Sequence, residues 1–278
     1  MNRFLKVFFF LSVIAIPVLL FRPSGNTPKN SPSDFLADFT ADNDEQPLED
    51  NKEMPYGRGQ IAIIFDDMGG SLDELRDLYS LNIPLTISVI PDLKFSRNIA
   101  HIGARCGFSV FIHLPLEPED QKKQESAGFK FITTSMSRRE AESLLRQYLN
   151  SIRIAIGVNN HMGSKATQDR RLSEIVIKAV KAKGLIFVDS QTSLESVTYS
   201  VARSEGLVCD YSRGFLDSGQ DYHSMHEKMK QFIAESQKKG KIIIIAHPRK
   251  NTIKFLKENL PEFEREVDFI TAREYFGI

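Results

Sequence analysis

The sequence contains no tryptophan and only two cysteines, Cys106 and Cys209, among its 278 residues. So few cysteines exclude a small disulfide-rich scaffold of the secreted type. Cys106 comes before one strand-like segment and Cys209 near the end of another, so the two would lie at opposite ends of a parallel barrel. We therefore predict two separate buried thiols and no disulfide.

The chain also has no excess of charge, because 36 basic residues balance 36 acidic residues. Such a balance creates no electrostatic field that would attract nucleic acid or acidic partners. Nucleic acid is therefore not a predicted partner, and nothing in the sequence indicates an oligomeric state. The function must be inferred from motifs.

A long apolar run occurs at the start, where two positive charges precede residues 7–21. The run is long for a signal-peptide core and shorter than the roughly 20 residues of a membrane-spanning helix. No small-residue cleavage site follows it. We predict that residues 1–21 are a signal or membrane anchor, with an uncleaved anchor in the inner membrane favoured and the remaining chain exported to face the periplasm.

Two further regions follow this segment. Residues 22–58 are rich in Pro, Ser, Asn and Asp and show no apolar periodicity, which predicts a disordered spacer. Residues 59–278 are nearly neutral and long enough to bury a sizeable core, so they are predicted to form a single folded domain.

Six apolar, strand-like segments of this domain each stop at a polar residue able to do chemistry. The segments alternate with helix-like stretches and no two-residue hairpin turn joins them, which predicts an α/β fold with a parallel β/α barrel of about seven strands. Functional side chains would then gather at its carboxyl rim. An open doubly wound sheet is the alternative. The polar residues are Asp66 and Asp67, His113, Asn159, Asn160 and His161, Asp189 and Ser190, Asp210, and His247.

The expected strands are residues 60–65, 84–90, 108–112, 155–158, 185–188, 207–209 and 241–246. Helices are expected to begin with capping boxes at Ser71 and Ser137. A long polar loop at residues 114–136 is typical of a lid or a binding loop.

Two histidines and one carboxylate, with one position left open, form a common catalytic zinc arrangement. His113 and His161 are candidate ligands on neighbouring strands, although a structural hydrogen-bonding role would explain either one alone. Of the adjacent carboxylates Asp66 and Asp67, one could bind the metal while the other acts as a base. Helix capping or the satisfaction of loop amides is the alternative for this pair.

The remaining candidates have broader interpretations. His247, at the exit of an apolar strand, is a candidate general acid or a residue that supports the site from behind. Asn159 and Asn160 carry amides suited to hydroxyl-rich ligands. We also predict substrate contacts for Ser164 and Asp189, although helix capping explains Asp189 and Asp210 about equally well. His223 and His226 fall at the start of an expected helix, where exposed side chains are a simpler interpretation than a metal site.

The motifs FDDMG, HLPLEP, GVNNHMGS, VDS and AHP, in this order over residues 65–248, resemble the divergent polysaccharide deacetylase family of bacterial envelope proteins. The resemblance implies a distorted β/α barrel and a divalent metal, with zinc favoured. It implies that Asp67, His113 and His161 are the ligands, Asp66 the base and His247 the acid. It also implies an envelope polysaccharide such as peptidoglycan as the partner.

The sequence departs from the family pattern at two places. Better-known members carry a second histidine four residues after the first, where this chain has Glu117, so His161 must provide the second imidazole. No clear R-x-P-x-G segment is present. Removal of acetyl groups from an N-acetylated glycan is the leading hypothesis, and a glycan-binding protein with a relic site or a metal-independent glycoside hydrolase are the alternatives.

Overall fold

A computed structural model of the protein describes residues 57–278, apart from residues 126 and 220. The predicted anchor at residues 1–21 and nearly all of the predicted spacer lie outside these described residues. Within the described part of the chain, no helix combines the length and apolar character that crossing a membrane requires.

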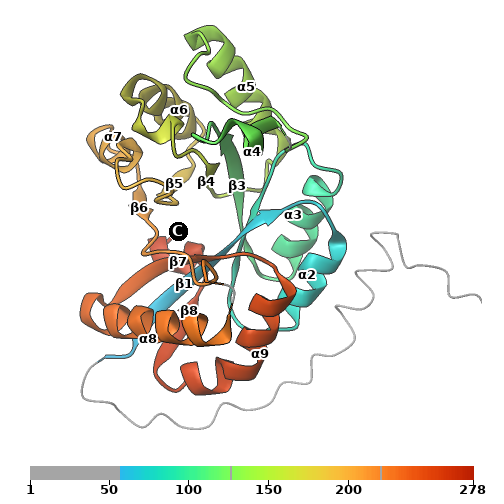
Figure 1. Ribbon diagram of the computed structural model, residues 1–278, viewed down its shortest axis with the longest axis vertical. Coiled ribbons are helices and arrows are strands. Elements are labelled where there is room, and N and C mark those ends of the chain that lie inside the picture. The colour runs from blue at the N-terminus through green and yellow to red at the C-terminus, as the bar shows by residue number, and fades with distance from the viewer. Residues whose placement is uncertain (1–56, 126, 220) are drawn as a thin grey trace, which may run out of the picture. The chain divides into compact units, whose positions relative to one another are not determined.

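Eight parallel strands form one sheet in the order β6-β5-β4-β3-β2-β1-β7, and β8 pairs with the beginning of β1. Helices cover the outside of the strands (Figure 1). This arrangement confirms the predicted α/β barrel of seven parallel strands. The strands are β1 (Gly59–Met68), β2 (Thr86–Val89), β3 (Ser109–Leu116), β4 (Gly157–Met162), β5 (Ile186–Asp189), β6 (Cys209–Tyr211), β7 (Lys241–Ala246) and β8 (Val267–Ile270).

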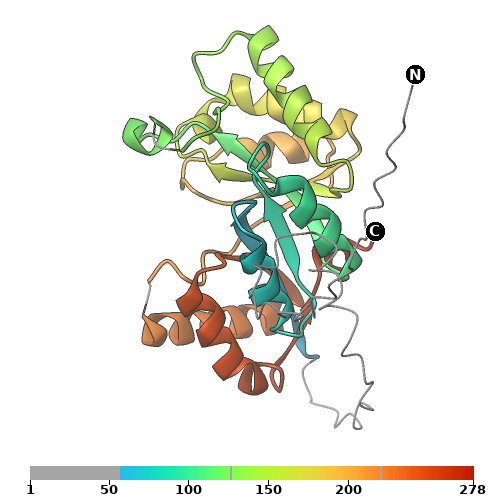
Figure 2. The same cartoon turned by 90° about the vertical axis from the view of Figure 1, so that its right-hand side faces the viewer.

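The helices follow the strands in alternation, as the sequence pattern predicts. Viewed from the side, α5 and α6 lie at one end of the molecule and α8 and α9 at the other (Figure 2). The helices are α2 (Leu72–Tyr79), α3 (Ser96–Arg105), α4 (Gln121–Glu125), α5 (Arg138–Ser151), α6 (Arg170–Ala182), α7 (Thr198–Ser204), α8 (Tyr222–Lys239), α9 (Lys250–Phe263) and α10 (Ala272–Phe276), with a 3-10 turn at Ala166–Gln168.

The barrel is closed by a short stretch of chain after β6. We call residues 213–216 the closing segment. Its backbone bonds to β7 through Arg213 N to Ile243 O at 2.9 Å, Ile245 N to Gly214 O at 3.0 Å and Leu216 N to Ile245 O at 2.8 Å. These bonds satisfy backbone groups that would otherwise remain unpaired between the two edge strands. The closing segment therefore completes the ring without forming a regular strand.

The core explains why β1 and β7 are almost continuously apolar. Ile61 to Phe65 and Ile242 to Ala246 are fully buried, as expected for parallel strands that are covered on both faces. At the amino end of the barrel, α10 packs its Tyr275 against Ile243 and Ile245. Backbone amides of α10 also donate to side chains at the starts of β2 and β3. The helix thus plugs this end, and the carboxyl end is left for chemistry.

Three differences from the expected elements affect the site. β4 extends through His161, so its polar residues lie within the strand and alternate between its two faces. β6 starts at Cys209, two residues later than expected, so Asp210 lies inside a strand. Helices α7 and α9 were not expected; α9 carries Pro261 and many lysines, which obscure its apolar face in the sequence.

Both cysteines are free, which confirms the prediction that they do not form a disulfide. They are half-buried, and Cys209 begins its strand instead of ending it, so the placement at opposite strand ends was wrong. Burial raises the pKa of Cys106, and it raises the pKa of Cys209 to about 11.

Slow alkylation of the native protein is therefore expected. The thiolate is the reactive form, and at pH 8 a pKa of about 11 leaves Cys209 with about a hundredfold less thiolate than an ordinary thiol. The alkylation rate should rise with pH over the range from 8 to 10. Mass spectrometry after iodoacetamide treatment measures this, with the urea-unfolded protein as the control. Equal labelling rates in native and unfolded protein would contradict the raised pKa.

Candidate metal centre and its acid-base groups

An irregularity at the end of β1 brings two adjacent carboxylates to the same side. The pairing of β1 with β2 shifts register between Phe65 and Met68, and Asp67 has a φ of 63°. A left-handed backbone at a residue other than glycine costs about 1–3 kcal/mol, and such strain is often found at functional sites. Successive residues of a regular strand would point to opposite faces. The irregularity lets both Asp66 and Asp67 reach the rim.

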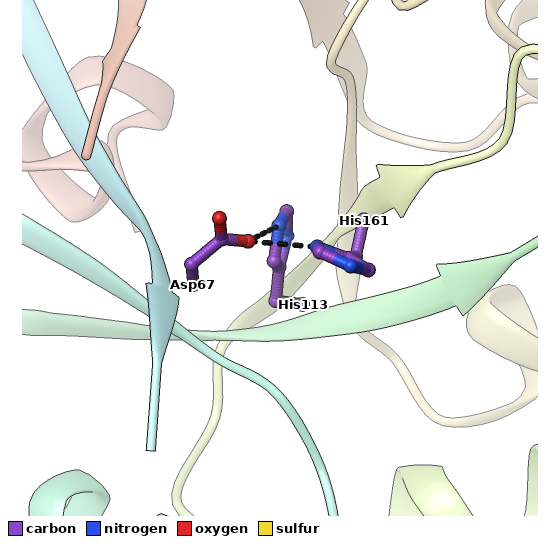
Figure 3. A group of neighbouring side chains, drawn as sticks. All are labelled: Asp67, His113 and His161. Atoms are coloured by element: carbon purple, nitrogen blue, oxygen red, sulfur yellow. Dashed lines mark hydrogen bonds and ion pairs between the residues drawn. The ribbon is translucent and has the colours of Figure 1, made fainter. Parts of the chain in front are cut away.

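Asp67, His113 and His161 converge on one point, each from a different strand (Figure 3). Asp67 Oδ1 lies 3.1 Å from His113 Nε2 and 2.7 Å from His161 Nδ1. One potential ligand atom from each residue lies within 4.8 Å of the other two, and no other such group occurs among the described residues. The predicted ligand set is therefore assembled in space, and it could hold a metal ion.

Asn159 fixes the orientation of the two groups beside it. Its Nδ2 donates to Asp66 Oδ1 at 2.8 Å, so its Oδ1 is the acceptor that faces His113 Nδ1 at 2.9 Å. His113 must then carry its proton on Nδ1, which leaves Nε2 with a lone pair. That lone pair faces Asp67 Oδ1. Two acceptors at this separation require a cation or a proton between them.

The charges of the site follow from burial and proximity. Burial raises the pKa of Asp66 well above its ordinary value; the Asn159 hydrogen bond opposes this, and the charges of Asp67 and Asp217 add to it. Burial also acts to raise the pKa of Asp67, but the two neighbouring imidazoles outweigh it and lower that pKa. Burial lowers the pKa of His113 to about 4, so its imidazole is neutral near pH 7, the form that binds metals.

His247 faces the same centre from β7. Its Nε2 lies 3.7 Å from Asp67 Oδ2, while its Nδ1 bonds to Asp217 Oδ1 at 2.9 Å. Asp217 also accepts from the His247 amide and from Thr252 Oγ1. Burial acts to raise the pKa of Asp217, but His247, Thr252 and Arg249 together lower it. The ionised carboxylate holds a proton on His247 Nδ1 and orients the ring.

Asp217 was missed by sequence reasoning. It follows the closing segment, where Phe215 and Leu216 are a two-residue apolar signal too short to predict a strand. The Phe215 ring lies nearly parallel to the His247 ring, with centroids 6.0 Å apart. The segment that closes the barrel therefore also supports the candidate acid.

Glu117, four residues after His113, takes no part in the metal group. It is buried, and its carboxylate accepts from Lys165 Nζ at 2.8 Å and from Thr134 N at 2.6 Å. Burial acts to raise its pKa, but these partners lower it. Glu117 ties the loop after β3 to the loop after β4, which is a structural role.

Three of the four predicted substrate-binding residues are buried and are hydrogen-bonded to neighbouring groups of the protein. Asn159 holds Asp66 and His113. Asn160, on the other face of β4, accepts from Ser190 N at 2.8 Å and donates to Met162 O at 2.7 Å. Asp189 is fully buried and accepts from the loop that follows it, at Gln191 N, Ser196 Oγ and Tyr199 N. In the structure these three side chains hold parts of the rim together.

The remaining candidates also lie apart from the metal group. Ser164 is half-buried, and its Oγ accepts from the Glu119 amide at 3.0 Å. Asp210 bonds to the hydroxyl of Tyr275 in the plugging helix at 2.6 Å. His226 lies 3.6 Å from Glu262, between α8 and α9, and belongs to no metal group within the described residues.

Comparison with known proteins identifies relatives in sequence and in fold. The chain is 31% identical to an uncharacterized protein of Haemophilus influenzae over 210 residues, which are 74% of each chain. It is 29% identical to an uncharacterized protein of Escherichia coli over 218 residues, covering 78% of this chain and 67% of the other. An uncharacterized Agrobacterium tumefaciens protein shares the fold, with a TM-score of 0.72 at 16% identity, over 81% of this chain and 92% of that chain.

The family assignment rests on the whole barrel. Residues 63–276 match the divergent polysaccharide deacetylase model. This range begins in β1 and ends in α10, and it includes all the residues that converge on the metal group. The chain therefore belongs to the divergent polysaccharide deacetylase family.

Proposed function

We propose that this protein is a metal-dependent deacetylase that hydrolyses the N-acetyl amide of an envelope glycan. One observation carries the proposal: the lone pair of His113 Nε2 and the carboxylate of Asp67 point at each other with His161 beside them. This donor set of two imidazoles and one carboxylate fits a zinc-type ion and leaves a coordination position open. Family membership supports the same chemistry.

A divalent metal held by these ligands would supply Lewis acidity, which polarises the amide carbonyl and makes water acidic enough to attack. Asp66 Oδ2, 3.6 Å from His113 Nε2, faces this position and accepts the proton of the attacking water. Its raised pKa makes it a better proton acceptor than an ordinary carboxylate once it is ionised.

His247 completes the reaction from a position beside Asp67 Oδ2. Its Nε2 donates a proton to the departing amine nitrogen, because its Nδ1 proton is held by Asp217. The carboxylate orients the imidazole so that its Nε2 faces the centre. Base and acid thus both lie beside the candidate metal group, as a reaction that first removes and then delivers a proton requires.

The structure weakens the glycoside hydrolase alternative. That reaction needs two carboxyl groups about 5–9.5 Å apart on opposite sides of a bond. Asp189 and Asp210, which would have to supply the second group, are both bonded elsewhere. A glycan-binding protein without turnover would use the same residues, and measuring acetate release distinguishes it from a deacetylase.

The location and the glycan are part of the proposal. The apolar run at residues 7–21 with its preceding positive charges supports a protein that faces the periplasm. Peptidoglycan is the abundant N-acetylated glycan in that compartment, so we take it as the substrate class.

Acetate release tests the proposed function. The purified protein, loaded with Zn²⁺, should release acetate from a tetramer of N-acetylglucosamine or from peptidoglycan fragments. Chelation with EDTA should abolish the release, and added Zn²⁺ should restore it. Tight glycan binding with no acetate from any of these glycans would instead support the binding protein.

A further inference from the structure

Phe129, in the loop after β3, is a half-buried aromatic residue beside the candidate metal centre. Its ring centroid lies 5.5 Å from that of His161, with an angle of 71° between the ring planes. Phe131 lies 5.2 Å from Phe129 and 6.1 Å from His161, and it is buried. Phe131 therefore packs against both Phe129 and His161 from the protein interior, while part of Phe129 stays open to solvent.

The loop that carries Phe129 is anchored directly after this residue. The hydroxyl of Tyr148 donates to Lys130 O at 2.6 Å, and Ile132 N donates to Pro115 O at 3.0 Å. Glu117 N donates to Ile132 O at 3.0 Å. These bonds place the ring before any ligand arrives, so ordering the loop on binding costs little.

Three of the four residues assigned to substrate recognition from the sequence have no exposed surface for that role. Asn159, Asn160 and Asp189 are buried and bonded within the rim, so they offer no surface to a glycan. A partly exposed phenyl ring contributes apolar surface next to the polar atoms of the centre. It suits a ligand with an apolar face beside an amide, because the electron-rich face of a phenyl ring attracts C–H groups.

We propose that Phe129 is the stacking platform for the sugar ring that carries the acetyl group. The proposal rests on the proposed function and deepens it, because it restricts the substrate to an N-acetylated pyranose. The C–H face of such a ring packs on Phe129 while its acetamide reaches the position between Asp67, His113 and His161. Acetylated amines that lack a sugar ring gain nothing from this contact.

Oligosaccharide binding tests the platform without requiring turnover. The full chain carrying Asp66→Asn, loaded with Zn²⁺, is titrated calorimetrically with the N-acetylglucosamine tetramer. Adding Phe129→Ala should weaken binding about tenfold or more, while Phe129→Trp should retain it. Phe276→Ala is the matched control, because Phe276 is also half-buried but lies in the plugging helix, and it should bind as the parent does.

Zinc content and acetate release separate this proposal from the proposed function. Unchanged zinc in Phe129→Ala shows that the loss of binding comes from the ring and not from His161. Absence of acetate from the wild type, with weaker binding in Phe129→Ala, refutes the deacetylase and supports the platform. Equal affinity with and without Phe129, or no binding by the parent, overturns the platform even if acetate is released.

Discussion

Alanine at His113 is expected to lower the affinity for Zn²⁺ by more than about 100-fold, the loss that removal of an outer-shell partner can already cause. The substitution removes one of the three protein ligands and leaves Asp67 and His161 to hold the ion alone. His161→Ala and Asp67→Asn should have effects of the same order. Zinc content after dialysis and a competitive titration with a chelator measure the change.

Two comparisons keep this prediction specific. Asp67→Asn preserves the side-chain shape, so a loss of zinc in that variant cannot be attributed to a cavity. His101→Ala, at an exposed position of α3, should bind zinc as the wild type does. Full zinc occupancy in His113→Ala and His161→Ala would remove the proposed metal centre.

Turnover should fall by about 10²–10⁴-fold in Asp66→Asn and in His247→Ala, while zinc remains bound. Asp66→Asn removes the proton acceptor yet keeps an oxygen for the Asn159 hydrogen bond. His247→Ala removes the donor to the leaving amine on a strand that supplies no metal ligand. Asp217→Asn should also lower turnover, because the neutral amide holds the His247 ring less firmly in this orientation.

Acetate release and zinc stoichiometry should be measured on the same samples of each variant. The expected pattern, with turnover lost and zinc kept, distinguishes these residues from the ligands. Unchanged acetate release in both Asp66→Asn and His247→Ala would refute the assigned acid-base roles even if the metal centre stands.

Much of the site could be predicted because polar residues stand out in apolar strands. His113 and His161 lie within buried strands, where a polar side chain needs a specific reason, and His247 directly follows the apolar strand β7. Asp66 and Asp67 follow five consecutive buried residues. Each of these signals lies within one short stretch of sequence, so it can be recognised without knowing the fold.

The parts that could not be predicted depend on contacts between distant segments. Asp217 is recognised as a functional residue only through its bond to His247, 30 residues away in the sequence. Asn159 was given to the substrate because its amide suits hydroxyl groups, and only the fold shows that Asp66 and His113 already use that amide. Nothing in the sequence around Phe129 indicates a binding role, because that role is inferred only from its contact with His161.

The position of β1 makes completion of the site dependent on the end of the chain. β1 supplies both carboxylates, yet its pairing partners include β7 and β8, which begin at Lys241 and Val267. Contacts of such long sequence separation form slowly during folding, because a large loop must close before they are gained. During synthesis, β1 cannot complete its pairing until nearly the whole chain has emerged from the ribosome. A ribosome-bound fragment that ends before β7 would therefore contain every proposed metal ligand and still lack a stable site.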